Sequence, residues 1–558
     1  MRRHLVTKNS FYARLADHGH EIVSDEDYAH LYSERKGRPS IPPSVMVRAM
    51  LCATHDHITS DAETSRRTRV DADWKAAMGV DDEFTGIGAT TFSLMRSRMV
   101  VHDADAALFE KTLEKAVAAG IFKAKLIAII DSSPVHGAGA VADTYELMRG
   151  FMRQVVGAAG ERLSEEARTA TEPFCGPKPD IDWQDPAIRK AHLAELVAAG
   201  MALLVEAAGI DDPAVAEPAD LLAQVIDQDV EADDSGEGNP QIRQGVAADR
   251  VISHSDPEMR HGRKSASRRF DGHKLDVITD EDSELVLGVE VRAGNASDGE
   301  GAVPLLGQVM ALPGIVIATL LGDMAYSDGD VRQAVEEQGA ELVGKVAPVT
   351  NGGRFPKTDF EINLQAGSVT CPAGVTTTDA RAARDHKGRP ANRFVFAPAT
   401  CAACPLVARC TKAKGGRQIT VGVHEARIAA ARAAQADPAI KALLRRRSKV
   451  ERKIDHLQDL GMRKAGADER RAYRRCSRPP WPTSSASVCS ARSTRRPPSP
   501  SPPDPGVFAA PGDDFGLPTA TIRPANLNRP VRPLFRAIKA LSGSGRAASA
   551  KATSCRVT

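Results

Sequence analysis

Two apolar runs that each lead into an aspartate constrain the fold of this chain more than any other feature. The first, residues 126–130, is rich in isoleucine and is followed directly by Asp131 and a Ser-Ser-Pro sequence. Its length and flanking residues predict a strand buried on both faces of an α/β sheet, with Asp131 just past its end. Taken alone, Asp131 also fits an ordinary turn or capping residue, because aspartate is a common turn former.

The second apolar run, residues 315–321, repeats the pattern. It leads to Asp323, and a polar loop with Tyr326, Ser327 and Asp328 follows. Ligands of open α/β sheets bind outside the carboxyl ends of the strands. The sequence therefore predicts two carboxylates delivered to one edge of a single sheet.

Length and composition favour a multidomain globular protein. The chain has 558 residues, of which 42% are hydrophobic, which predicts two to four domains. No apolar run is long enough to span a membrane, and the N-terminal segment has no apolar core, so we expect a cytoplasmic protein with no membrane partner. Nine cysteines in such a compartment indicate free thiols or metal ligands.

The formal net charge of +2 is unevenly distributed. Acidic residues are concentrated in residues 161–249, and basic residues in 260–274 and 441–478. Local basic tracts favour contacts with a polyanion at particular surfaces. Solvated helix faces are the alternative.

The N-terminal part predicts helices over residues 39–101. A Gly-rich turn precedes Thr90 and Thr91, which we expect to be N-caps, and the helix after them carries Arg96 and Arg98. A helix, a turn and a short basic helix are compatible with a helix-turn-helix DNA-binding unit. Capped helices with a few arginines also occur in proteins that bind no DNA.

The middle of the chain predicts a helical, acidic stretch over residues 144–249 and then a β-hairpin. The hairpin consists of GHKLDVITD and SELVLGVEVRAG, joined by a polar turn at 280–283, and a helix at 301–310 follows. Basic residues before and inside the hairpin are candidates for phosphate contacts, with solvated loop charge as the alternative: Arg260, Arg263, Lys264, Arg268, Arg269 and Lys274.

These features together resemble the DDE transposases of bacterial insertion sequences. The resemblance covers roughly residues 38–465 and rests on Asp131 in IIDSSPV, the hairpin block 270–299, Asp323 in GDMAYSD, and Glu451 in RRRSKVERKIDHLQDLGMRKA. It implies an α/β fold with an RNase H-like mixed-sheet core and a helical N-terminal domain. It also implies double-stranded DNA as partner, both element ends and target, and a homo-oligomer assembled on DNA.

The resemblance assigns a catalytic role to Asp131, Asp323 and Glu451, which would bind Mg²⁺ or Mn²⁺. Two such ions can polarise the attacking and leaving oxygens of a phosphodiester, and hard cations take carboxylate ligands. Arg447 matches the arginine that the family places four residues before the glutamate, although an ordinary ion pair would look the same. The chain departs from the family at Leu444, where a tyrosine is expected, and at Gln458, where a lysine is expected.

The domain boundaries that follow are residues 1–120 for a DNA-binding domain and 121–465 for the catalytic domain. Within the latter we place the helical insertion at 144–249 and a small Cys-rich β insert at 350–415. In that insert, Cys371, Cys401, Cys404 and Cys410 have the spacing C-x29-C-x2-C-x5-C, with KGRPANRFVFAP as a strand pair between them. Four thiolates suit a structural tetrahedral Zn²⁺; reduced thiols in a small β module are the alternative.

The last part of the chain, residues 466–558, has no helical or strand period and is dominated by Arg, Pro and Ser. A disordered basic tail is one explanation. We favour a frameshift near codon 466, because the resemblance to the family stops abruptly after Ala465. The sequence thus predicts a transposase that cuts and rejoins DNA. Two alternatives are a frameshifted remnant that retains only DNA binding and a related nuclease without strand transfer.

Overall fold

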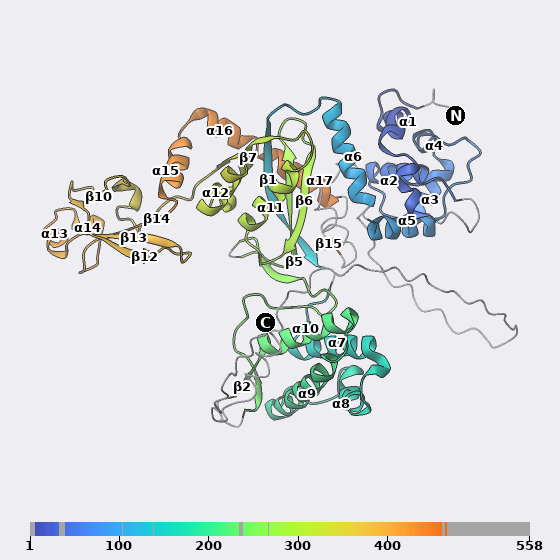
Figure 1. Ribbon diagram of the computed structural model, residues 1–558, viewed down its shortest axis with the longest axis horizontal. Coiled ribbons are helices and arrows are strands. Elements are labelled where there is room, and N and C mark those ends of the chain that lie inside the picture. The colour runs from blue at the N-terminus through green and yellow to red at the C-terminus, as the bar shows by residue number, and fades with distance from the viewer. Residues whose placement is uncertain are drawn as a thin grey trace, which may run out of the picture. The chain divides into compact units, whose positions relative to one another are not determined.

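The computed structural model describes residues 6–32, 40–102, 104–137, 139–233, 238–265, 267–459 and 464–465 (Figure 1). The described residues divide into two compact units, one of residues 6–137 with 262–465 and one of residues 139–261. The tail predicted at 466–558 lies outside the described residues. Among the described residues, no helix has both the length and the apolar character needed to cross a membrane.

The first unit begins with the predicted helical region. Its core includes the fully buried Trp74 and Phe92. Pro43 occupies the first turn of its helix, as the sequence predicts. The helices of this region are α1 (Phe11–Ile22), η2 (Glu26–Leu31), α2 (Pro43–His55), α3 (Asp61–Val70), α4 (Ala72–Met78), α5 (Ala89–Val101) and α6 (Ala104–Ala118).

The prediction that Thr90 and Thr91 cap the fifth helix is wrong. Helix α5 begins at Ala89 and its N-cap is Gly88, so both threonines lie in the first helical turn. Glycine is an acceptable N-cap, and its extended backbone here sets the start of the helix one residue before the threonines.

A mixed seven-stranded sheet forms the centre of the first unit (Figure 1). Its main order is β4-β5-β1-β7-β8, with β6 also paired to β5 and β15 to β1. Strand β1 is antiparallel to β5 and parallel to β7, and β7 is parallel to β8. The strands are β1 (Leu126–Gly137), β4 (Arg260–Arg263), β5 (Arg269–Asp280), β6 (Val286–Ala293), β7 (Ile317–Gly322), β8 (Glu341–Gly344) and β15 (Lys464–Ala465).

The predicted hairpin is confirmed by the antiparallel pairing of β5 with β6. The prediction that the first strand ends at residue 130 is wrong, because β1 continues to Gly137. Strand β5 pairs with β1 as far as His136, and this partner keeps the Ser-Ser-Pro sequence extended. Pro134 is tolerated because the pairing with β7 on the other side of β1 has already ended at Ile129.

Helices pack on this sheet and share one hydrophobic core with it. The predicted helix 301–310 starts three residues earlier, at Asp298, after Ser297 as N-cap. The helices and 3₁₀ turns around the sheet are α11 (Asp298–Met310), η4 (Met324–Tyr326), α12 (Gly329–Glu337), α15 (Glu425–Ala434), α16 (Pro438–Arg445) and α17 (Ser448–Leu457).

The predicted Cys-rich β insert is built from two three-stranded sheets, in the orders β11-β10-β9 and β12-β13-β14. KGRPANRFVFAP is not a strand pair by itself: it holds β13, whose partners β12 and β14 lie outside it. The elements are η5 (Lys357–Asp359), β9 (Glu361–Asn363), β10 (Ser368–Thr370), β11 (Thr376–Thr377), β12 (Ala380–Arg384), β13 (Pro390–Val395), α13 (Pro398–Ala402), α14 (Val407–Cys410) and β14 (Gln418–Gly422).

The second unit contains the helices predicted between residues 144 and 249. Its core includes Leu147, Phe151 and Leu222, all fully buried. Arg149 is also buried, where it donates to the carbonyls of Phe174, Gly176 and Pro177 and so closes the loop before the third long helix. The elements are α7 (Thr144–Ala159), η3 (Gly160–Arg162), α8 (Glu165–Cys175), α9 (Pro186–Ala207), α10 (Pro213–Asp229), β2 (Val230–Ala232) and β3 (Pro240–Ile242).

The buried centre of β1 can be tested with a matched pair of substitutions. Ile129 is fully buried, whereas Ile121 is 49% exposed. Ile129→Ala removes the same atoms as Ile121→Ala but leaves a cavity, so we expect it to lower the free energy of unfolding by about 2–5 kcal/mol. Ile121→Ala should change it by less than about 0.5 kcal/mol. Urea unfolding followed by circular dichroism measures both, and equal losses would contradict the register of β1.

Candidate active site

The two predicted aspartates emerge side by side from neighbouring parallel strands. The pairing of β1 with β7 ends at Ile129 opposite Leu321. Asp131 and Asp323 each lie two residues beyond that last pair, so the strands deliver both carboxylates to the same edge. Asp323 is further fixed as the N-cap of η4, where its Oδ1 accepts from the Ala325 amide at 2.8 Å.

Helix α17 carries Glu451 and is fastened to the hairpin turn. Its buried residues Val450, Ile454 and Leu457 belong to the core of the sheet. The buried Glu281 carboxylate accepts from Lys449 Nζ at 2.7 Å and from Arg446 Nη1 at 3.1 Å. Burial on one face, the ion pair of Lys449 in its first turn and the ion pair of Arg446 just before it fix the side of α17 that faces β1.

Arg447 joins two of the three candidate catalytic carboxylates. Its Nη1 donates to Asp131 Oδ2 at 3.0 Å, and its Nη2 donates to Glu451 Oε1 at 2.6 Å. The sequence suggested a local pair between Arg447 and Glu451; the bond to Asp131, 316 residues away, is the additional finding. One guanidinium therefore neutralises charge that two converging carboxylates would otherwise leave unbalanced.

The pKa of Asp131 is raised from its ordinary 3.8 to about 6. Burial is the largest cause, and the nearby charges of Asp323 and Glu451 raise the pKa further. Arg447 and the Ser132 amide, which donates to Asp131 Oδ1 at 2.9 Å, oppose the shift. The influence of both other carboxylates on Asp131 shows that the three candidates share one electrostatic environment.

A cavity of about 260 Å³ opens beside this group. Asp323, Arg447 and Glu451 line it together with Lys345 and Leu444. Leu444 thus stands at the site, where the family has a tyrosine. The other departure, Gln458, lies on the β1 side and donates through Nε2 to Ser133 Oγ at 2.6 Å.

A buried polar network behind the aspartates was not predicted from the sequence. Asp276, in β5 opposite Ser132, is fully buried and accepts from Arg292 Nε. Burial raises its pKa, and the Arg292 charge opposes that rise. The Tyr326 hydroxyl, in the turn after Asp323, donates to the other oxygen of Asp276 at 3.4 Å. The signal available in the sequence was a charged residue inside the apolar strand LDVIT.

The same network includes one of the predicted phosphate contacts. Lys274 Nζ donates to Asp298 Oδ1 at 2.8 Å, and Ser132 Oγ donates to the same oxygen at 3.0 Å. Only 14% of the Lys274 side chain is exposed. Lys274 therefore connects β5 to the start of α11 and braces the segment next to Asp131.

The other predicted DNA contacts divide into two groups. Arg96 pairs with Asp61, and Arg98 stacks 5.2 Å from the centre of the Tyr32 ring, so both side chains have partners inside the helical region; Thr91 is half-buried. In contrast, the residues at and after β4 are exposed: Arg263, Lys264, Arg268 and Arg269. Arg260 pairs with Asp249 at 2.7 Å.

The oxygen donors of Asp131, Asp323 and Glu451 have the chemistry that Mg²⁺ requires. Within the described part of the chain, however, no three His, Cys, Asp or Glu side chains are already grouped as a metal site. The positive charge that lies between Asp131 and Glu451 is the guanidinium of Arg447. The three carboxylates are suitable ligands for Mg²⁺, and Arg447 pairs with two of them, Asp131 and Glu451.

All four predicted cysteines face one small cavity, of about 30 Å³, in the insert: Cys371, Cys401, Cys404 and Cys410. Two of the sulfurs accept backbone hydrogen bonds at 3.4 Å, Cys401 from Arg417 and Cys404 from Leu406. Burial and the other three thiols raise the pKa of Cys410, which the Arg417 charge opposes. Four sulfurs around one cavity, two of them hydrogen-bonded, suit a thiolate-bound Zn²⁺ in donor chemistry.

Two family models match this chain. Residues 1–98 match a transposase domain (DUF772), and residues 370–467 match a transposase DDE domain. The two matches support a DDE transposase of the insertion-sequence type. The second match contains the four cysteines, Arg447 and Glu451. No curated protein and no solved structure matches the chain.

The raised pKa of Asp131 predicts a pH-dependent stability of this protein. Because the folded state binds this proton more tightly than the unfolded chain, the stabilisation is complete below about pH 4 and is lost as pH rises through about 6. Asp131→Asn keeps a neutral side chain at every pH. We expect it to gain up to about 3 kcal/mol over the parent protein between pH 4 and pH 7. Urea unfolding in EDTA measures the difference, and a constant difference across this range would contradict the raised pKa.

The zinc that the cysteine spacing leads us to expect can be tested directly, because the four thiols line one cavity but are not grouped as a metal site among the described residues. We expect about one zinc ion per purified chain, and Cys404→Ser should remove most of it because a tetrahedral site needs all four ligands. Cys175→Ser is the matched control, since Cys175 lies in α8 outside the insert. Metal analysis of dialysed protein gives the answer: equal zinc content in the two variants, or none in the parent, would exclude the site.

Proposed function

We propose that this chain is an insertion-sequence transposase that binds the terminal inverted repeats of its element and catalyses Mg²⁺-dependent DNA strand cleavage and strand transfer. The observation that carries the proposal is that Asp131 and Glu451 share Arg447 and that the charges of Asp323 and Glu451 both act on Asp131. The three carboxylates come from three separate parts of the chain.

The topology of the sheet supports an RNase H-like core. An antiparallel pair, β6 and β5, lies beside β1, and the parallel strands β7 and β8 continue the sheet on the other side. In this order the two aspartates occupy adjacent parallel strands. The transposase DDE family match over residues 370–467 includes α17, the helix that carries Glu451.

The three carboxylates would hold the divalent metal, Mg²⁺ or Mn²⁺. When bound, two such ions polarise the attacking hydroxyl or water and the leaving oxygen of a phosphodiester. The chain itself contributes rigid placement. Asp131 is held by pairing on β1, Asp323 by the cap of η4, and Glu451 by the ion pairs of α17 with Glu281.

Arg447 and Asp131 set the charge of the site before DNA arrives. Arg447 keeps two carboxylates in place by pairing with both and offsets one of their two negative charges, and its guanidinium is also suited to a phosphate oxygen. Asp131 has to lose its proton to act as a ligand. Because its pKa is about 6, it is ionised at neutral pH. The site is thus electrostatically poised for a cation and a phosphate.

DNA recognition is assigned to the remaining basic surfaces. The helical domain matched by the transposase family over residues 1–98 would bind the element ends through α5, which carries Thr91, Arg96 and Arg98. To contact DNA, Arg96 would have to leave Asp61 and Arg98 would have to leave Tyr32. The exposed Arg263, Lys264, Arg268 and Arg269 would contact phosphates, and Lys274 would act by bracing. Double-stranded ends and target imply a homo-oligomer on DNA, in the cytoplasm.

A frameshifted remnant that only binds DNA is the second candidate. The DDE match ends at residue 467, next to the position where the sequence changes character after Ala465. Leu444 and Gln458 replace two residues that the family places near the scissile phosphate. The remnant and the active enzyme differ in metal-dependent cutting alone.

Cleavage of a DNA duplex that carries the element end tests the proposal. With Mg²⁺ the parent protein should nick the duplex, and Asp131→Ala, Asp323→Ala and Glu451→Gln should each lower the rate by at least about a thousandfold. Asp455→Asn removes an exposed carboxylate one turn further along α17 and should leave the rate unchanged.

Three other outcomes would revise the proposal. End binding without any nicking would favour the remnant. Nicking without joining of the 3′-hydroxyl end to a target would favour a nuclease that lacks strand transfer. Equal loss in Glu451→Gln and Asp455→Asn would remove Glu451 from the site.

A further inference from the structure

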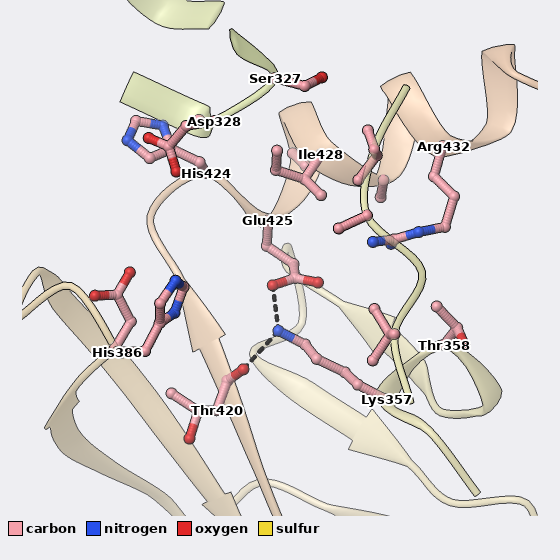
Figure 2. Close-up of a pocket in the computed structure, with 18 of the residues that line it drawn as sticks. Ser327, Asp328, Lys357, Thr358, His386, Thr420, His424, Glu425, Ile428 and Arg432 are labelled. Atoms are coloured by element: carbon pink, nitrogen blue, oxygen red, sulfur yellow. Dashed lines mark hydrogen bonds and ion pairs between the residues drawn. The ribbon is translucent and has the colours of Figure 1, made fainter. Parts of the chain in front are cut away.

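A large groove of about 1,390 Å³ lies between the segment after Asp323 and the Cys-rich insert. Its walls come from η4 and the start of α12, the loop 345–350, strands β12 to β14, and α15. Figure 2 shows Glu425, Ile428 and Arg432 extending from α15 toward the same space as Lys357. The candidate catalytic residues Asp131 and Glu451 do not line it.

The charge of the groove is predominantly positive. Its lining contains six Lys or Arg side chains and three carboxylates. Each carboxylate has a cation inside the groove: Glu425 pairs with Lys357, Asp385 with Arg389, and Asp328 with Lys387 at 3.0 Å. Figure 2 shows the contacts of Lys357 with Glu425 and with the Thr420 carbonyl.

Two arginines remain without such a partner. The side chains of Arg393 on β13 and Arg432 on α15 form no hydrogen bond or ion pair with any described residue. A third, Arg384, donates only to the Gly388 carbonyl, at 2.6 Å. These guanidiniums line the groove and have donors available for phosphate oxygens, which arginine binds in a bidentate manner.

The groove also has an apolar part. Leu364 is 49% exposed. Six aliphatic residues line the groove: Val346, Pro348, Val349, Ile362, Leu364 and Ile428. Apolar surface next to unpaired cations suits a ligand that has both phosphates and exposed flat rings. A single DNA strand offers both, whereas a duplex stacks its bases inside.

The groove is next to the cavity of the candidate active site. Met324, half-exposed, lines both this groove and the smaller cavity that contains Asp323, Arg447 and Glu451. Ala325, whose amide binds Asp323, also lines the groove. A strand leaving the smaller cavity past Met324 would therefore enter the groove directly.

The insert is fastened to this segment, so the groove has a defined shape. Arg389, between β12 and β13, donates to Asp328 at 3.2 Å and to Asp330 at 2.8 Å at the start of α12. His424 Nε2 lies 2.6 Å from the other oxygen of Asp330. Gly329 lies against His424, where a Cβ would approach the His424 Cβ at 2.4 Å, so no larger residue fits between the two walls.

We propose that the groove binds a single DNA strand adjacent to the cleaved bond, with Arg393 and Arg432 on its phosphates and the aliphatic residues against its bases. The proposal rests on the proposed function, because it identifies the strand as one that continues from the phosphate held near Asp323. In this proposal the Cys-rich insert would hold single-stranded DNA. The helical domain would bind only the duplex.

Binding of a fluorescein-labelled single strand of mixed sequence, about 12 nucleotides long, tests the proposal. The measurement is fluorescence anisotropy at several salt concentrations, with full-length Asp131→Asn protein as parent so that no cleavage occurs. Arg393→Ala/Arg432→Ala should weaken binding by at least about tenfold. It should also reduce the slope of log affinity against log salt by about 1.4, because each phosphate contact to a single strand contributes about 0.7.

Lys412→Ala/Lys414→Ala is the matched control. These lysines are exposed in the same insert and do not line the groove, so affinity and slope should be unchanged. Arg393→Lys/Arg432→Lys keeps both charges and should retain the slope, which separates a lost contact from a misfolded insert.

Three results would overturn the proposal: unchanged binding in the alanine pair, equal losses in the groove and control pairs, or a requirement for the two arginines that appears only with duplex DNA. Because the readout is binding by a cleavage-deficient protein, it is independent of whether the wild-type chain cuts DNA. Failure of the groove and failure of the proposed catalytic function are therefore distinguishable.

Discussion

The pairing of β1 with β5, from Ala128 opposite Asp280 to His136 opposite Gly272, is the constraint on which the rest of the site depends. It keeps β1 extended beyond the end of its pairing with β7, so that Asp131 projects from a rigid strand and not from a turn. A carboxylate in such a position cannot retreat into solvent, and burial accordingly raises its pKa to about 6. The neighbouring strand then only has to end at the right level to place Asp323 beside it.

The position of Glu451 depends on ion pairs and not on strand pairing. Helix α17 has one buried face, but a hydrophobic face alone lets a helix slide along a sheet. The bonds from Lys449 and Arg446 to Glu281 define where α17 begins relative to the hairpin turn, and Arg452 adds a bond to Glu284 at 3.0 Å. Positional accuracy at Glu451 therefore comes from charges that play no part in the chemistry.

The sequence was most informative where a local pattern determines the structure. Buried strands, the hairpin and the helix with Glu451 could be predicted because apolar spacing and turn residues act over a few positions. The extension of β1 could not, since its partner β5 lies about 140 residues further along the chain. The same holds for Arg447 on Asp131, for Asp276 beneath the site, and for the groove, whose lining comes from several separate segments. Charges such as Glu281 look like solvated turn residues until tertiary structure shows what they hold.

The guanidinium of Arg447 also bears on whether this protein can fold before a metal ion binds. Clustered carboxylates usually make a fold depend on its metal, because the unneutralised site repels itself. Here the guanidinium of Arg447 offsets part of the negative charge of Asp131 and Glu451. Under the proposed function, this pairing would let Asp131 and Glu451 adopt their positions before any divalent ion binds. The same arginine would then become available to a DNA phosphate once a bound cation takes over that charge, so that folding and metal loading would be separate events.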